Sequence, residues 1–276
     1  MTTFIAIAGG KGGSGKTTVS INLSSALEIF GRETVIVDAN LSKPNLGLCL
    51  GLTNIPKSVH TAVAGQHRLD EAIFYHPSGI KVIPCHTSMD YLRDSQYSAA
   101  LHHMLNDLAE KTELVLIDTA SGFSDETMNI LQAVDQVILV TTPTLASVTD
   151  CLKTLRLCQE KSIQVMGVII NKVHESNHEM DVDNIHTILE VPVIGVIPYC
   201  HDLMDAQQHK YPVVYTHEHS KSGIAFKKLA ANLIGEEYHP DVSADESLLS
   251  YILQKTGLRR NMREEKTQVE NNEKKK

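Results

Sequence analysis

Tryptophan is absent from this chain, and aromatic residues make up only 5% of its 276 residues. Proteins that bind single-stranded nucleic acid stack bases on aromatic side chains, so this shortage argues against that class. Basic residues are also in deficit, because 25 Lys and Arg face 33 Asp and Glu and leave a net charge of −8. A surface built to grip DNA phosphates is therefore not expected, although a local basic patch would escape this count.

Cysteines are few, and no two of them form a C-x-x-C pair. We therefore expect buried, reduced thiols and a cytoplasmic protein. The fourteen histidines show no zinc-site spacing with these cysteines, so we expect no structural metal other than Mg²⁺. The first apolar stretch, residues 4–8, has no basic residue before it and runs directly into glycines, which predicts a buried strand rather than a signal peptide or a membrane span.

Short runs rich in Val and Ile recur along the chain and predict strands that are buried on both faces. Helix-like patterns, such as those over residues 17–30 and 147–159, lie between these runs. The alternation predicts an α/β fold over residues 1–236, with a single doubly wound, mostly parallel sheet flanked by helices. Ligands of such sheets bind beyond the carboxyl ends of the strands. The expected strands cover residues 4–8, 34–37, 80–84, 114–117, 136–140, 165–170 and 193–197.

A glycine-rich stretch, GGKGGSGKTT, follows the first expected strand and opens the first expected helix. It satisfies G-x-x-x-x-G-K-[ST], a loop whose N–H groups surround phosphate oxygens at a helix amino terminus. Lys16 would neutralise the β and γ phosphates of ATP, and the Thr17 hydroxyl would bind Mg²⁺. The candidate nucleotide-binding residues of this loop are Gly10, Lys11, Gly12, Gly13, Ser14, Gly15, Lys16, Thr17 and Thr18.

Lys11 is the unusual residue of this loop, because an ammonium without an anionic partner would repel Lys16. We therefore expect it to serve a neighbouring subunit. With Lys11 in place, the loop matches K-G-G-x-x-K-[ST], and the chain resembles the MinD/ParA family of deviant Walker A ATPases from residue 2 to about 235. The resemblance implies a P-loop NTPase fold of the SIMIBI type. It also implies Mg-dependent ATP hydrolysis and an ATP-sandwich homodimer in which Lys11 reaches the partner's nucleotide.

After the second expected strand, Asp38-Ala39-Asn40 resembles the D-x-D of the family's switch I. The resemblance makes Asp38 a candidate in the Mg²⁺ site and gives position 40 a role in orienting the attacking water. An asparagine there can orient water but cannot accept its proton, so we expect slow hydrolysis that depends on an activating protein. The alternative is that Asn40 suffices as it stands.

The apolar strand at residues 114–117 ends in Asp118, which is the Walker B pattern and a candidate Mg²⁺ site. A strand-terminal Asp can also simply cap the next helix. Gly122 resembles the switch II glycine, whose amide can meet the γ-phosphate. The intervening Ala120-Ser121 departs from the proline or glycine that relatives commonly have.

Two further strand ends resemble the family's nucleobase elements. The pair Asn171-Lys172 matches its N-[KR] motif, and an Asn amide offers both the donor and the acceptor that adenine requires. The segment from Gly195 to Pro198 resembles the loop that closes over the base, although Tyr199-Cys200-His201 replaces the acidic residues that many relatives carry next.

The composition changes near Glu236, and residues 237–276 are expected to hold a short helix at about 244–256 and a polar tail whose last dozen residues are disordered. The apolar face of that helix would carry Leu248, Leu249, Ile252 and Leu253. Residues 255–276 hold eight Lys or Arg and four Asp or Glu, a net of +4. This pattern suits contact with an anionic membrane surface on the inner face of the cell membrane, reached through a dimer, or contact with a partner. The alternative is a helix that packs on its own domain.

The leading hypothesis is thus a MinD-type ATPase switch for cell-division site or flagellar placement. A ParA-type ATPase that binds DNA nonspecifically is the alternative, and the net acidity weighs against it. A metabolic or cofactor-assembly relative is a third possibility, but the metal-binding cysteine pair usual in such proteins is missing.

Overall fold

The computed structural model describes residues 1–86, 97–122, 124–174, 176 and 178–240. Eight strands form one sheet in the order β3-β4-β2-β5-β1-β6-β7-β8, and every neighbouring pair except β3–β4 is parallel. The strands are β1 (Thr3–Ala8), β2 (Thr34–Ala39), β3 (Phe74–Tyr75), β4 (Lys81–Ile83), β5 (Leu114–Thr119), β6 (Gln136–Thr141), β7 (Val165–Val173) and β8 (Val193–Pro198).

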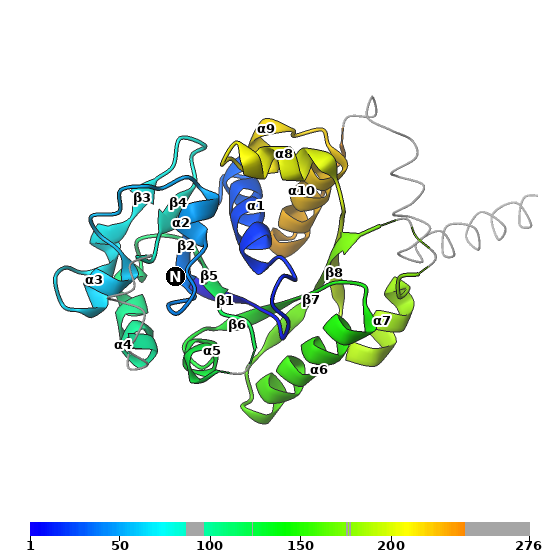
Figure 1. The fold of residues 1–276 in the computed structure, drawn as a ribbon, viewed down its shortest axis with the longest axis horizontal. Helices are drawn as coiled ribbons and strands as arrows, with labels where there is room; N and C mark the ends of the chain where they lie inside the picture. The colour runs from blue at the N-terminus through cyan, green and yellow to red at the C-terminus, as the bar shows by residue number, and fades with distance from the viewer. Residues whose placement is uncertain (87–96, 123, 175, 177, 241–276) are drawn as a thin grey trace, which may run out of the picture.

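Helices cover both faces of this sheet (Figure 1). The α-helices are α1 (Lys16–Ile29), α2 (Leu46–Cys49), α3 (Val59–Val63), α4 (Tyr97–Met104), α5 (Asp125–Leu131), α6 (Leu145–Glu160), α7 (Val182–Leu189), α8 (His201–Gln208), α9 (Val213–Thr216) and α10 (Lys221–Ile234). Two 3₁₀ turns, Leu69–Ala72 and Leu105–Leu108, complete the described set.

Successive side chains of each strand enter different cores, as the period of two requires. In β1, Ile5 and Ile7 pack against α1, α9 and α10, whereas Ala6 and Ala8 face α5, α6 and α7. The strands β2, β4 and β5 contribute in the same way to a core beneath α3 and α4. Both faces of the sheet are therefore buried, which accounts for the continuous Val and Ile runs in the sequence.

The fold class expected from the sequence is confirmed, and each of the seven expected strands lies in the sheet. The strand β3 was not expected. It has two residues, pairs antiparallel to β4 at the sheet edge and exposes both side chains, so it lacks the apolar run that marks the other strands. The predicted helix at 244–256 and its tail lie outside the described residues.

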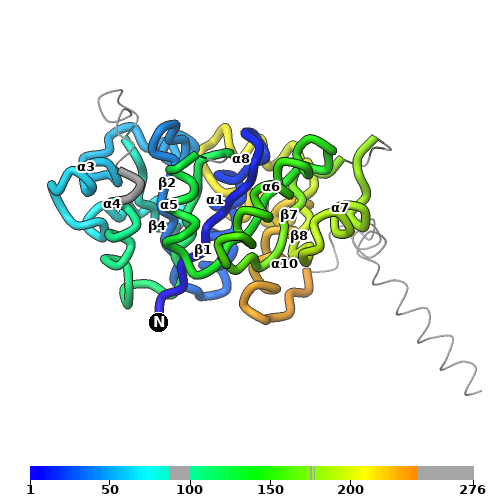
Figure 2. Tube along the Cα trace, turned by 90° about the horizontal axis from the view of Figure 1, so that it is seen from below, coloured from blue at the N-terminus to red at the C-terminus, as the bar shows by residue number. Residues whose placement is uncertain are grey.

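This arrangement gathers the strand ends that the motifs occupy. Figure 2 shows α1 and β1 in the middle of the molecule, with α3 and α4 at one end and α7 at the other. Because β1, β2, β5, β6, β7 and β8 run in the same direction, their carboxyl ends share one edge of the sheet. All five cysteines are free thiols. Within the described ranges, no helix is long and apolar enough to cross a bilayer.

Candidate functional site

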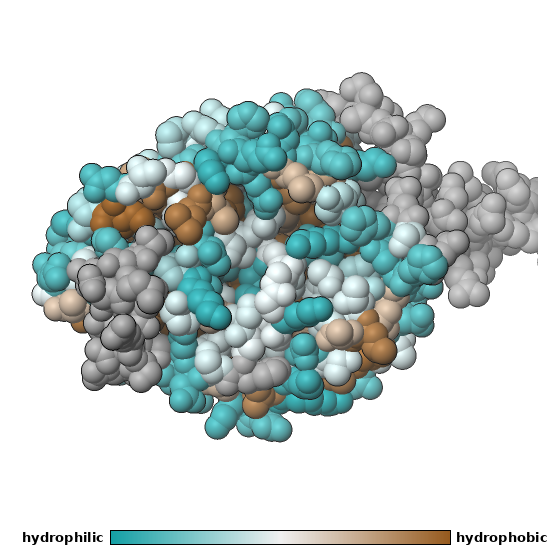
Figure 3. All heavy atoms as spheres, viewed as in Figure 1, coloured by the Kyte–Doolittle hydropathy of each residue, from teal (hydrophilic) through white to brown (hydrophobic). Residues whose placement is uncertain are grey.

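Residues 9–15, called the phosphate loop below, connect β1 to α1 in the middle of the sheet edge. Gly15 caps α1 with a positive φ of 94°. A Cβ atom at this position would lie 2.1 Å from Nδ2 of Asn171, so both the backbone conformation and the space require glycine. In the view of Figure 3, pale surface marks this loop between hydrophilic and apolar areas.

Two carbonyls of the phosphate loop accept hydrogen bonds from side chains, whereas most of its N–H groups are open. Asn171 Nδ2 donates to Ser14 O at 2.9 Å, and Lys172 Nζ donates to Gly13 O at 2.9 Å. In contrast, the N–H groups of residues 11–15 have no hydrogen-bond acceptor within the described parts of the chain. Convergent open N–H groups at the start of α1 form a cradle for an anion such as phosphate.

Lys16 lies beneath this cradle with only 6% of its surface exposed. Its Nζ donates to Ser121 Oγ at 2.6 Å. Burial lowers the pKa of Lys16, while the nearby Asp118 carboxylate acts in the opposite direction. The ammonium is thus held by one hydroxyl and one acid, and it remains close to the loop whose N–H groups are open.

Thr17 and Asp118 meet at the carboxyl end of β5. The Thr17 hydroxyl donates to Asp118 Oδ2 at 2.6 Å, and Ser20 Oγ donates to Asp118 Oδ1 at 3.3 Å. Asp118 is fully buried, and loss of hydration raises its pKa to about 6. A buried carboxylate beside a hydroxyl is a hard-oxygen donor set that fits Mg²⁺, because the cation would favour the charged form of the acid.

Asp38 stands beside Asp118, since the two residues are register partners on β2 and β5. Burial, followed by repulsion from Asp118, raises the pKa of Asp38 well above its usual value. Its carboxylate already accepts two backbone N–H groups, from Asn40 at 3.1 Å and from Leu46 at 3.2 Å. Asp38 thereby shapes the loop that carries Asn40, which is half-buried. Gly122 follows β5 with a positive φ of 88°.

The predicted nucleobase residues surround a cavity of about 150 Å³ on the other side of α1. Asn171 is buried, and its Oδ1 accepts the N–H of Lys172 at 2.9 Å, so both ends of the amide contact the protein. Each end keeps capacity for one more partner, which leaves base recognition as a prediction. The cavity is lined by Thr18, Asn171, Lys172, Pro198, Tyr199, Cys200, Leu203, Met204 and Gln207.

Lys11 lies on the open side of the phosphate loop. Its side chain is exposed, and it borders a second cavity of about 290 Å³ together with residues 12–14 and the loop before α6. No hydrogen bond or ion pair within the described residues engages its ammonium. The structure therefore brings together the predicted phosphate, Mg²⁺ and base residues, and among the described residues it gives the exposed Lys11 ammonium no hydrogen bond or ion pair.

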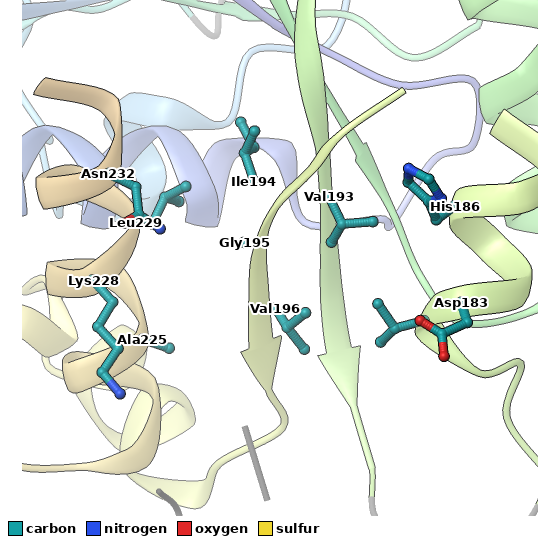
Figure 4. Close-up of a pocket in the computed structure, with 11 residues that line it drawn as sticks. Asp183, His186, Val193, Ile194, Gly195, Val196, Ala225, Lys228, Leu229 and Asn232 are labelled. Carbon is teal, nitrogen blue, oxygen red and sulfur yellow. The ribbon is translucent and has the colours of Figure 1, made fainter. Parts of the chain in front are cut away.

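A larger groove of about 380 Å³ lies elsewhere, between α7, the edge strand β8 and α10 (Figure 4). Its polar groups come from Asp183 and His186 on one side and Lys228 and Asn232 on the other. Burial lowers the pKa of Lys228. None of the predicted site residues lines this groove, so the phosphate loop is the better candidate despite its smaller cavities.

Three residues of the site were not found from the sequence. Ser121 holds Lys16, and Gln207 Nε2 donates to Thr18 Oγ1 at 2.8 Å. Glu126 binds the loop after Asn40. The departure at Ala120-Ser121 was a signal for Ser121, but Glu126 looks like an ordinary acid in the first turn of a helix, and Gln207 carries no signal.

Comparison with known proteins agrees with this geometry. A ParA family model, described as the NUBPL iron-transfer P-loop NTPase, matches residues 1–234. An uncharacterized ATP-binding protein of Methanocaldococcus jannaschii is 34% identical over 92% of this chain and 96% of its own length. The antiactivator FleN of Pseudomonas aeruginosa is 30% identical over 82% of this chain and 84% of FleN.

Among solved structures, the septum site-determining protein MinD of Pyrococcus horikoshii, complexed with Mg-ADP, is similar to this chain with a TM-score of 0.79. The two are 30% identical, and the match covers 84% of this chain and 96% of the other. The likeness thus extends over the sheet and over the loops at its carboxyl edge.

Proposed function

The chain belongs to the ParA family of P-loop NTPases, and from that premise we propose that it is an ATP-dependent, dimerising switch of the MinD type. In this proposal the chain binds ATP with Mg²⁺, pairs with a second copy around the nucleotide, binds a surface or partner in that state and resets by slow hydrolysis. The names of a solved relative, a septum site-determining MinD, and of the antiactivator FleN support the MinD branch.

The proposal depends on the convergence of Lys16, Thr17 and Asp118 at the sheet edge. Lys16 is suited to bind phosphate, and Thr17 and Asp118 are suited to bind Mg²⁺. Open N–H groups of the phosphate loop bind the β-phosphate, and the Lys16 ammonium offsets charge on the γ-phosphate. Thr17 and Asp118 would hold Mg²⁺, and Asp38, beside Asp118 on the neighbouring strand, would add negative charge to the site. Mg²⁺ neutralises phosphate charge, and the chain's own task is to fix the phosphates in line with a water.

Asn40 would orient that water without accepting its proton. Phosphoryl transfer depends mainly on positioning and on charge stabilisation, so hydrolysis can proceed at a low rate without a carboxylate at this position. We propose that an activating protein raises the rate, and the half-buried position of Asn40 leaves room for such a partner to contact its loop.

Lys11 supports dimerisation, since its exposed ammonium borders the cavity beside the phosphate loop and has no hydrogen bond or ion pair to any residue that the structure describes. An anionic phosphate on a second copy would supply the missing partner. The proposed cellular role is placement of the division site or of flagella from the cytoplasm. Contact with the inner face of the cell membrane would come from the helix expected at residues 244–256.

Lys11 in the phosphate loop and Lys16 directly after it provide the test of the switch. Lys16→Ala should abolish ATP binding in calorimetry, whereas Lys11→Ala should bind ATP with wild-type affinity but stay monomeric in light scattering with ATP. Lys161→Ala, which removes an exposed lysine at the end of α6 that lines neither cavity of the site, is the matched control and should still dimerise. ATP-dependent dimers of the Lys11 variant would refute the cross-subunit role.

The surface that the dimer binds is tested by co-sedimentation of the full chain and of residues 1–240. Each is mixed with anionic liposomes or with duplex DNA, in ADP or in a slowly hydrolysed ATP analogue. We expect the full chain to bind liposomes with the ATP analogue and the shorter chain to lose this binding. Liposome binding that survives truncation would exclude the tail as the anchor, and DNA binding would favour the ParA-type alternative.

A further inference from the structure

The loop at residues 40–45, called the switch I loop below, is held by a carboxylate from a distant helix. Glu126 on α5 accepts the N–H of Leu41 and, at 3.2 Å, the N–H of Ser42 through the same oxygen. Its second oxygen accepts the Ser42 hydroxyl at 2.9 Å. These contacts join residues 84 and 85 positions apart in the sequence. Hydrogen bonds to an ionised acceptor are about twice as strong as neutral ones, so Glu126 is a firm attachment.

The opposite side of the same peptide segment is also held. Leu41 is 5% exposed, and its carbonyl accepts from His60 Nε2 at 3.2 Å. His60 is itself buried, and its Nδ1 accepts the N–H of His86 at 3.0 Å, which assigns the ring proton to Nε2. Leu41 therefore lies between α5 and α3 with both its N–H and its carbonyl bound, and its neighbour Asn40 can move little.

Glu126 also lies close in sequence to Gly122, in the segment that connects β5 to α5. The helix α5 begins at Asp125, three residues after Gly122, and Ser124 caps it by accepting the N–H of Thr127 at 3.3 Å. A half-buried side chain in this first turn thus links the segment that carries Gly122 to the loop that carries Asn40.

We propose that Glu126 is a positioning residue for ATP hydrolysis, which acts by fixing Asn40 relative to the segment of Gly122. The proposal rests on the ATPase activity proposed above, and it assigns to Glu126 the role of keeping Asn40 in place for that reaction. Glu126 does not contact the phosphate loop, so its effect falls on the hydrolytic step and leaves ATP binding unchanged. Misplacement of a catalytic group by about 1 Å can cost up to a hundredfold in rate.

An ordinary structural role would look different. An acid in the first turn of a helix stabilises it through the helix dipole, and this effect depends on the negative charge alone. Asp125 is the matched control, because it lies in the same turn and is exposed, whereas the hydrogen bonds from Leu41 and Ser42 go to Glu126. Glu126→Gln separates the two roles further, since the amide loses the charge but keeps an oxygen for the N–H groups of Leu41 and Ser42.

The experiment measures ATP hydrolysis by the full-length wild type, Glu126→Ala, Glu126→Gln and Asp125→Ala. For Glu126→Ala we expect kcat to fall about tenfold or more while KM for ATP stays within about twofold. Glu126→Gln should remain within about threefold of the wild type, and Asp125→Ala should equal it. Equal rates in all four proteins, or equal losses in Glu126→Gln and Glu126→Ala, would overturn the proposal.

Amide hydrogen exchange without nucleotide provides a readout that does not depend on hydrolysis. The Leu41 and Ser42 amides should exchange about tenfold faster in Glu126→Ala than in Asp125→Ala, because only the first variant frees them. Unchanged exchange in Glu126→Ala would refute the attachment itself. A wild type that hydrolyses no ATP, with exchange as expected, would instead count against the proposed function and remove the positioning role with it.

Discussion

The phosphate loop and the switch I loop lie at the same sheet edge, yet their backbones are held in opposite ways. In the phosphate loop, side chains of Asn171 and Lys172 bind carbonyls, and the N–H groups of residues 11–15 have no acceptor among the residues that the structure describes. In the switch I loop, the carboxylates of Asp38 and Glu126 bind the N–H groups. One loop thus presents donors outward, and the other has its donors bound by acids.

This difference indicates how each loop can respond to a nucleotide. The phosphate loop is shaped in advance for an anion, so binding there requires no protein bond of an N–H group to break. The switch I loop can rearrange only if a protein carboxylate gives up an N–H group. The first loop is therefore suited to binding and the second to a conditional response.

The strongest way to break the comparison is to deform the phosphate loop. Gly15→Ala should weaken ATP binding more than a hundredfold by calorimetry and lower stability by about 1–3 kcal/mol, because the loop would need a strained φ and lose the bond from Asn171. Gly12→Ala is the control, since its Cβ would come no closer than 3.9 Å to any neighbour. Equal loss of stability in both variants, measured without nucleotide, would contradict this account.

Asp118 stands where the two loops meet, and its titration gives a second test. Because burial raises its pKa from 3.8 to about 6, the folded chain binds a proton that the unfolded chain releases between these values, so the charge destabilises the fold as pH rises through this window. With a chelator present, Asp118→Asn should therefore have a free energy of unfolding, measured in urea, that is higher than the wild type's by about 1–3 kcal/mol at pH 8. Below pH 4 the two proteins should differ little. If the stability gain of Asp118→Asn did not shrink as the pH is lowered, ionisation of Asp118 would not be its cause.

The same variant should lose the benefit of Mg²⁺. With Mg-ADP present, the wild type should gain stability and Asp118→Asn should gain much less, because the charged oxygen that favours the cation is gone. The sign of the difference between the two proteins should thus reverse when chelator is replaced by Mg-ADP at pH 8.

A smaller effect, on the rate of ATP hydrolysis, is expected from a substitution at Asn40 in the switch I loop. Asn40→Asp should raise kcat for ATP hydrolysis a few-fold, since a carboxylate can accept a proton from the attacking water. ATP affinity should not change, because Asn40 lies outside the phosphate loop. A flat or lower rate would show that the amide is already adapted to its task, and repeating the measurement in the Glu126→Ala background would show whether the gain requires a fixed loop.

The two loops also differ in how far the sequence predicts them. The phosphate loop is a local pattern of glycines and lysines, and the strand ends of a parallel sheet bring Thr17 and Asp118 together, so both could be predicted. The attachment of the switch I loop joins Leu41 to Glu126, 85 residues away, and no local pattern records such a pairing. The edge strand β3 was missed for a related reason, since two exposed residues carry no periodicity.

The contact between Lys16 and Ser121 has a consequence for the order of events in the site. A phosphate that draws the ammonium away removes the partner of a hydroxyl one residue before Gly122. The segment that leads to α5 would thereby respond to nucleotide binding without a direct contact between that helix and the nucleotide. Lys16 would thus couple the binding of a phosphate to the segment that carries Gly122, through a single hydrogen bond that is broken when the phosphate binds.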